Sequence, residues 1–129
     1  MKNYLLDTHA LLWFLEGNSK LSTRANNLIL TQPQNCFFSV ASLWEITIKV
    51  SLNKLYLDYN LSELEELLYK NGIEILPIRF VHLKELIQLP FHHKDPFDRL
   101  IISQAKTEKL CIVSADTIFP NYQDIEIFW

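Results

Sequence analysis

The segment YLLDTHALLWFLEG (residues 4–17) changes from a short apolar run to a helical pattern at one aspartate, Asp7. The three residues before Asp7 are all apolar, as expected for a strand that is covered on both faces. The residues after it supply the apolar surface of a helix, and Gly17 is well suited to end that helix. This segment therefore predicts a buried strand that leads directly into a helix, with an acidic side chain at the junction.

The same pattern recurs near the other end of the chain, where the apolar run of CIVSAD (111–116) stops before Asp116. Between these motifs, further strands are expected at 36–38 and 73–78, a last strand at 125–128, and further helices at 22–31, 39–51, 62–72, 80–89 and 96–109. Ser62 and Glu65 have the spacing of a capping box for one of these helices. Strands that alternate with helices predict an α/β fold, a three-layer α/β/α sandwich with a mostly parallel central sheet. No linker or repeat divides the sequence, so residues 1–129 are expected to form a single domain.

The composition is that of an ordinary globular protein with a slight acidic excess. Hydrophobic residues make up 49% of the 129 residues, charged residues make up 21%, and the net charge is −3. This charge excludes a generally basic nucleic-acid surface, although a bound cation could attract phosphate locally. Polar residues interrupt the long charge-free span 25–44, so no membrane helix is expected and the protein should be soluble and cytoplasmic. Cys36 and Cys111 lie in apolar runs and are expected to be buried free thiols.

Four acids are expected to meet at one edge of the sheet. Parallel strands end at the same edge, which brings Asp7 and Asp116 together, and open α/β sheets bind their ligands there. Glu45 in SLWEI and Asp98 in DPFDR, both in helix-start contexts, could complete the cluster. Two like charges about 4 Å apart cost on the order of 4 kcal/mol at an effective dielectric of 20, so such a cluster needs a cation. Hard oxygen ligands select Mg²⁺ or Mn²⁺ over zinc.

Each acid also has a simpler structural explanation. Asp7 and Asp116 could each be a helix cap or a turn former, although Thr8 could cap the first helix and leave Asp7 free. Glu45 could be a surface acid paired with Lys49 four residues later. These explanations account for single residues, whereas a shared metal site accounts for the whole set.

The segment before the sixth expected helix holds further candidates. Asp95 and Asp98 have a spacing similar to that of a capping box, and we expect Asp95 to be mostly structural and Asp98 mostly functional. His92 and His93 suggest zinc, but adjacent side chains point apart in most backbones. Both histidines are therefore expected to be solvated loop residues.

Four motifs in order resemble the PIN domain, and most closely the VapC-type toxin ribonucleases of bacterial toxin–antitoxin pairs. They are DTHALLW (7–13), SLWEITIKVSLNKL (42–55), HKDPFDRLIISQA (93–105) and VSAD (113–116). The resemblance implies a parallel α/β/α sandwich and a Mg²⁺- or Mn²⁺-dependent endoribonuclease. It places the catalytic, metal-binding acids on Asp7, Glu45, Asp98 and Asp116, with Ser114 as a supporting hydroxyl. It further implies a homodimer and a small cognate antitoxin that occludes the acidic pocket.

The working hypothesis assigns a role to each residue of the candidate site. Asp7 and Asp98 ligate the metal directly, and Glu45 and Asp116 hold its waters or a second ion. Arg99 or Lys49 positions the RNA backbone, unless these side chains are only solvated surface charges. The alternatives are a non-catalytic PIN-fold domain that binds proteins and a structure-specific DNA nuclease.

Overall fold

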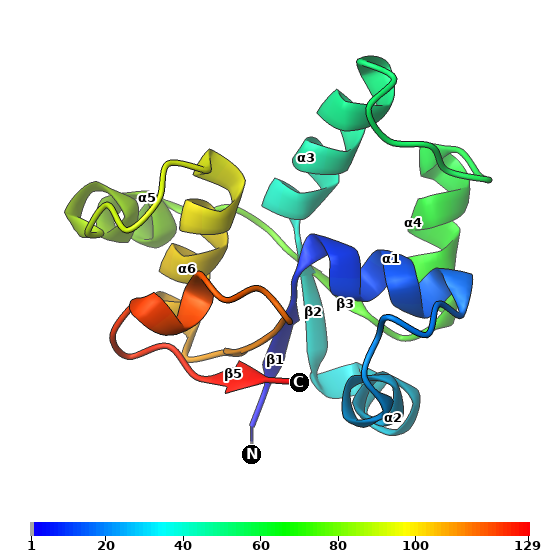
Figure 1. Ribbon diagram of the computed structural model, residues 1–129, viewed down its shortest axis with the longest axis horizontal. Coiled ribbons are helices and arrows are strands. Elements are labelled where there is room, and N and C mark those ends of the chain that lie inside the picture. Colours follow the sequence, from blue (N-terminus) through cyan, green and yellow to red (C-terminus); the bar gives the residue numbers. More distant parts are fainter. Residues whose placement is uncertain (1) are drawn as a thin grey trace.

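The computed structural model describes residues 2–129, which form alternating strands and helices (Figure 1). The strands are β1 (Tyr4–Leu6), β2 (Cys36–Ser39), β3 (Glu74–Leu76), β4 (Cys111–Val113) and β5 (Ile127–Phe128). The helices are α1 (Thr8–Glu16), α2 (Thr23–Thr31), α3 (Val40–Ser51), α4 (Leu61–Lys70), α5 (Phe80–Gln88) and α6 (Pro96–Glu108). Two short 3₁₀ turns, η1 (Pro33–Asn35) and η2 (Phe119–Asn121), complete the described elements.

The strands pair in the order β3-β2-β1-β4-β5, and every pair is parallel. Leu6 at the end of β1 lies opposite Phe38 of β2 and Val113 of β4. The chain thus builds outward from β1 on one side and later crosses to its other side. This crossing makes a topological switch point between the carboxyl ends of β1 and β4, where open α/β sheets bind ligands.

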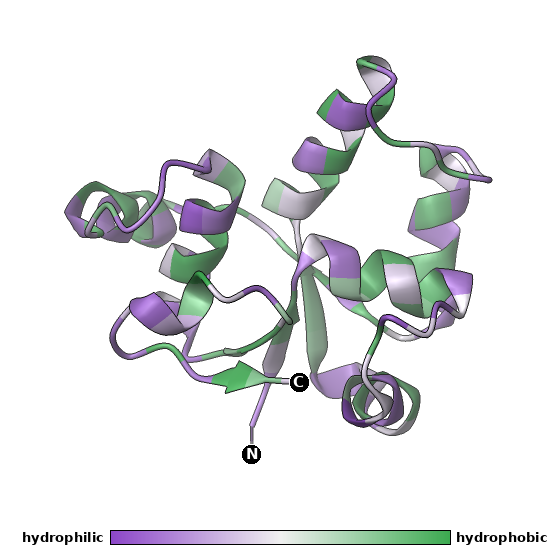
Figure 2. Ribbon diagram, in the orientation of Figure 1, coloured by the Kyte–Doolittle hydropathy of each residue, from purple (hydrophilic) through white to green (hydrophobic). Residues whose placement is uncertain are grey.

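Alternate residues of the central strands pack on opposite faces of the sheet. Tyr4 and Leu6 belong to a core shared with α1, α2, α3 and α4, whereas Leu5 belongs to a core shared mainly with α5 and α6. In Figure 1 these two groups of helices lie on either side of the sheet, and in Figure 2 the central strands are among the most hydrophobic parts of the ribbon. The expected three-layer α/β/α sandwich is therefore confirmed.

Two local expectations need correction. The capping box of α4 uses Asn60 and Glu63, not Ser62 and Glu65, because the Asn60 side chain accepts from the Glu63 backbone N–H at 2.9 Å and the Glu63 side chain accepts in return. The strand expected at 73–78 forms a ladder only over Glu74–Leu76, since it is an edge strand that pairs with β2 alone.

Other local features agree with the expectations. Gly17 ends α1 with a φ of 66°, a left-handed conformation that glycine adopts without steric cost. Cys36 and Cys111 are buried free thiols. Within residues 2–129, no helix is both long enough and apolar enough to cross a bilayer.

Candidate active site

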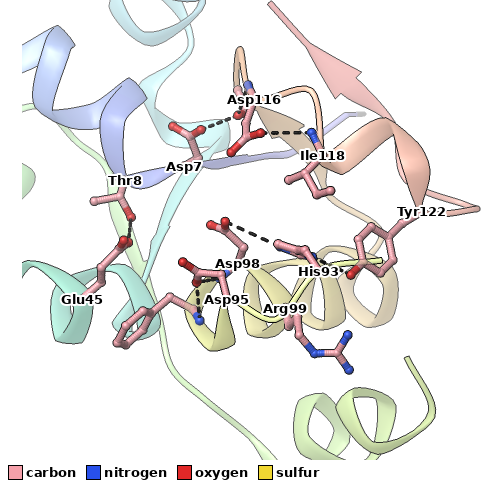
Figure 3. A network of polar contacts seen from close by, with 12 residues as sticks. Asp7, Thr8, Glu45, His93, Asp95, Asp98, Arg99, Asp116, Ile118 and Tyr122 are labelled. Atoms are coloured by element: carbon pink, nitrogen blue, oxygen red, sulfur yellow. Dashed lines mark hydrogen bonds and ion pairs between the residues drawn. The ribbon is translucent and has the colours of Figure 1, made fainter. Parts of the chain in front are cut away.

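A cavity of about 210 Å³ opens at the carboxyl edge of the sheet, beside the switch point. All four predicted acids line it, and Figure 3 shows them converging from α3, from the first turn of α6 and from the segments that follow β1 and β4. Its lining residues are Asp7, Thr8, His9, Glu45, Lys49, Asp95, Asp98 and Asp116. The sequence motifs therefore meet in space, as the parallel topology requires.

Asp7 both caps α1 and faces the cavity. Its Oδ1 accepts from the Ala10 backbone N–H at 2.7 Å, and its Oδ2 accepts from the Ser114 hydroxyl. The expectation that Thr8 caps this helix is wrong, because Asp7 is the last extended residue and Thr8 already lies in the helix. Burial raises the pKa of Asp7, and the two hydrogen bonds oppose part of that rise.

Glu45 is brought to the cavity by the start of α3, which the Ser39 hydroxyl caps by accepting from the Ala41 backbone N–H. The side chain of Glu45 is buried. One carboxylate oxygen accepts from the Thr8 hydroxyl at 2.7 Å, and the other lies 2.7 Å from Lys49 Nζ. The ion pair with Lys49 therefore exists, but the burial of Glu45 shows that it is more than a surface acid.

Ser114 links the acid at the end of β1 to the acid that follows β4. Its hydroxyl donates to Asp7 and accepts from the Asp116 backbone N–H at 2.9 Å. Asp116 itself is exposed, and its Oδ1 accepts from the Ile118 backbone N–H at 3.0 Å. Asp116 therefore stabilises a turn, which was its simpler expected role, and it also lines the cavity.

Asp98 projects from the first turn of α6 (Figure 3). Asp95 caps this helix by accepting from the backbone N–H groups of Phe97 and Asp98 at 2.9 and 3.0 Å, as expected. Burial, followed by the neighbouring carboxylates, raises the pKa of Asp98 to about 7. The cavity therefore holds more negative charge than its protein partners compensate.

The donor set fits a hard divalent cation. In the part of the chain that the structure describes, no three acidic, histidine or cysteine side chains form a ready ligand set for one ion. Mg²⁺ does not need such a set, because it retains several waters and is usually held by one or two carboxylates. An acidic cavity whose carboxylates repel one another is chemically suited to that mode of binding.

The other predicted residues differ in their relation to the cavity. Lys49 lines it, paired with Glu45. Arg99 is not among the lining residues, since its buried guanidinium donates to the backbone carbonyls of Pro90 and Leu89 at 2.8 and 3.1 Å. The geometry therefore gives no support to Arg99 as a contact for the RNA backbone.

The expectation for the two histidines is only half right. His92 is exposed, but the side chain of His93 is only 16% exposed and lies beside Asp98. The only feature of the sequence that relates His93 to Asp98 is their separation of five residues. This separation does not show which way the side chain of a loop residue points.

A family model described as PIN domain matches residues 4–125, a span that includes all four acids. The chain belongs to the PIN domain family. PIN domains of VapC toxins are typically nucleases that act on phosphodiester bonds, and PIN nucleases generally use divalent metal ions. No curated protein matches this PIN domain significantly in sequence.

Several solved structures with the same fold are VapBC or FitAB toxin–antitoxin complexes. A DNA-bound VapBC of Salmonella typhimurium has a TM-score of 0.72 at 19% identity, over 99% of this chain and 98% of that chain. FitAcB from Neisseria gonorrhoeae has a TM-score of 0.70 at 20% identity, over 98% of this chain and 96% of that chain. VapBC2 from Rickettsia felis, bound to a DNA fragment from its promoter, has a TM-score of 0.69 at 17% identity. The match covers 97% of this chain and 96% of that chain. At these identities the likeness establishes a common fold.

Proposed function

We propose that this PIN domain is a Mg²⁺- or Mn²⁺-dependent endoribonuclease and the toxin of a type II toxin–antitoxin pair, acting in the cytoplasm. The observation that carries the proposal is the convergence of four carboxylates in one cavity at the switch point of the sheet. The membership in the PIN family supports a nuclease. The fold shared with VapBC and FitAB toxins supports the biological role.

In this proposal, Asp7 and Asp98 bind the cation directly, and Glu45 and Asp116 hold its waters or a second ion. A divalent cation supplies charge neutralisation at the scissile phosphate and lowers the pKa of an attacking water. Thr8 and Ser114 keep the carboxylates of Glu45 and Asp7 in place through their hydroxyl groups. The residues of this chain therefore contribute orientation and negative charge at fixed positions.

The lysine in the cavity has a second possible role. Lys49 Nζ pairs with Glu45, and the Lys49 side chain remains 40% exposed. We propose that this ammonium contacts a phosphate oxygen next to the scissile bond. Such a contact places the RNA backbone over the acids, which by themselves would repel it.

The proposed reaction predicts the chemical ends of the products. Attack by water on phosphorus forms one P–O bond and breaks the P–O3′ bond, which leaves a 5′-phosphate and a 3′-hydroxyl. The test is to incubate the purified protein with end-labelled single-stranded RNA and Mn²⁺, and to identify the ends. We expect cleavage to stop with EDTA and to leave 3′-hydroxyl ends.

Other outcomes of this experiment would contradict the proposal in distinct ways. Cyclic 2′,3′-phosphate ends would indicate attack by the RNA 2′-hydroxyl. Cleavage of branched DNA with RNA left intact would favour a structure-specific DNA nuclease. A non-catalytic protein-binding domain would cleave neither substrate and would give no heat in a calorimetric titration with Mn²⁺.

The acidic cavity also suggests how an antitoxin would inhibit this domain. A basic side chain of a bound protein could compensate Asp98 and its neighbours in place of a metal ion. A hollow of about 260 Å³ is lined in part by the apolar residues Leu43 of α3 and Leu61 of α4. Helix α3 also carries Glu45. We propose that the antitoxin anchors there and reaches the acids with a basic residue.

Helix α5 suggests the surface of a homodimer. It exposes apolar side chains at helical spacing, with Phe80 81% and Ile87 84% exposed, and Phe91 beyond its end 79% exposed. Several large apolar side chains exposed along one short segment favour an interaction site. A two-fold axis would place these apolar side chains against the same side chains of a second copy. We therefore propose that two copies associate through α5.

Ile87→Asp tests the proposed dimer. The wild-type chain of 15.2 kDa should elute at twice that mass in size-exclusion chromatography with light scattering. The variant should elute as a monomer, because it places a charge in the apolar contact. A matched Tyr69→Asp substitution, which introduces the same charge at an exposed apolar position of α4, should leave the mass unchanged. Equal masses for the wild type and Ile87→Asp would contradict the use of α5.

A further inference from the structure

The loop before α6 places a half-buried histidine, His93, beside Asp98 of the acidic cavity, and the roles proposed above give this histidine no function. His93 Nε2 is buried and has no hydrogen-bond partner within residues 2–129. Asp98 Oδ2 lies 3.6 Å from this nitrogen, slightly beyond hydrogen-bond distance (Figure 3). Unpaired buried polar atoms are rare in native proteins, so this one requires an explanation.

Tyr122 contacts the other nitrogen of the His93 ring. His93 Nδ1 lies 2.7 Å from the Tyr122 hydroxyl, and Tyr122 is itself buried. When the hydroxyl donates to Nδ1, the neutral ring carries its hydrogen on Nε2, and this is the tautomer on which the inference below depends. A positively charged ring would carry a hydrogen on Nε2 as well. In both states a donor faces the carboxylate of Asp98.

Asp98 differs from the other acids of the cavity in its hydrogen bonds. Asp7, Glu45 and Asp116 each accept a hydrogen bond from at least one protein donor. Within the described chain, by contrast, no donor forms a hydrogen bond with the Asp98 carboxylate, and His93 Nε2 lies 3.6 Å from its Oδ2. The orphan donor and the orphan acceptor therefore face each other.

The loop that carries His93 is held at its base. The Arg99 guanidinium donates to the backbone carbonyls of Leu89 and Pro90, where the loop leaves α5, and stacks on Phe91 at 3.8 Å. Asp95 caps α6 where the loop ends. The ring of His93 is therefore placed by contacts on both sides of it in the sequence, as well as by Tyr122.

We infer that His93 is a positioning residue, which holds the carboxylate of Asp98 in the orientation that binds a divalent cation, with Tyr122 as its anchor. This inference rests on the proposed function, since it concerns the same cavity. Partners that orient a metal ligand typically change metal affinity by about 10- to 100-fold when they are removed. Shortening the 3.6 Å separation to about 3.2 Å would complete the hydrogen bond.

The test compares Mn²⁺ affinity, measured by calorimetry, among matched variants. His93→Leu removes the donor and should weaken Mn²⁺ binding by about 10-fold or more. His93→Gln places an amide N–H near the position of Nε2 and should recover most of the affinity. His92→Leu is the control, because His92 is exposed and also packs against Tyr122, with 4.6 Å between the two ring centroids. Melting curves in EDTA should show all variants folded.

A second measurement needs no metal. The ¹⁵N spectrum of the His93 ring should show the hydrogen on Nε2, and Asp98→Asn should shift that signal. A neutral ring with its hydrogen on Nδ1 would overturn the inference. Equal Mn²⁺ affinity of His93→Leu and the wild type would also overturn it, even if RNA cleavage supported the proposed function. A wild-type protein that binds no Mn²⁺ would overturn both.

Discussion

Asp7→Asn should reduce metal-dependent RNA cleavage on the order of 10³-fold, because it removes one charge from a proposed direct ligand. The loss should come from chemistry and not from unfolding. Asparagine can still accept from the Ala10 backbone N–H at the start of α1, and it is as good a cap as aspartate. Initial rates at saturating RNA, measured across a range of Mn²⁺ concentrations, provide the measurement.

The control for this prediction is an acid outside the cavity. Asp58→Asn makes the same chemical change at an exposed position in the loop between α3 and α4, and its cleavage rate should match the wild type. The melting temperatures of both variants in EDTA should lie within a few degrees of the wild type. If Asp7→Asn retained more than a tenth of the wild-type rate, Asp7 could not be a direct ligand.

The convergence of the acids could be predicted because it follows from topology. Asp7 and Asp116 each end an apolar strand, and the carboxyl ends of parallel strands must lie at one edge. Glu45 lies on α3, which follows β2, and Asp98 lies in the first turn of α6, which leads into β4. Their approach to the same edge required only that the helices begin there.

The support around the acids could not be predicted, because it depends on contacts between distant side chains. The Thr8 hydroxyl bonds to Glu45 instead of capping its own helix, which the local pattern of α1 does not reveal. His93 and Tyr122 are 29 positions apart and meet through the path of two loops. Loop paths follow from packing, for which hydrophobic periodicity carries no signal.

The position of Arg99 could not be predicted either. In the sequence, a basic residue next to a candidate catalytic acid suggested contact with RNA. The helical turn of α6 instead directs Arg99 toward the carbonyls of Leu89 and Pro90. Adjacent residues on a helix point about 100° apart, so proximity in sequence to Asp98 did not imply a place in the cavity.

Asp98→Asn should have opposite effects on stability and on activity, because the charge that binds the cation is unfavourable without it. The pKa of Asp98 is about 7 in the folded protein, above the ordinary value of 3.8. Between these values the folded state binds a proton that the unfolded state has lost, so this group lowers the free energy of unfolding as pH rises toward 7. The destabilisation is complete above pH 7 and absent below about pH 4.

The neutral asparagine should therefore raise the free energy of unfolding in EDTA at pH 8 by about 1–3 kcal/mol, less than the full linkage value because Asp98 is partly exposed. At pH 4 the two proteins should be equally stable. Adding Mn²⁺ at pH 8 should stabilise the wild type and not the variant, since a ligand stabilises only the state that binds it. Urea unfolding at both pH values measures these differences, with Asp58→Asn as the control. A variant less stable than the wild type in EDTA at pH 8 would mean that the Asp98 carboxylate is stabilised within the cavity. The cluster of acids would then require no cation to compensate Asp98.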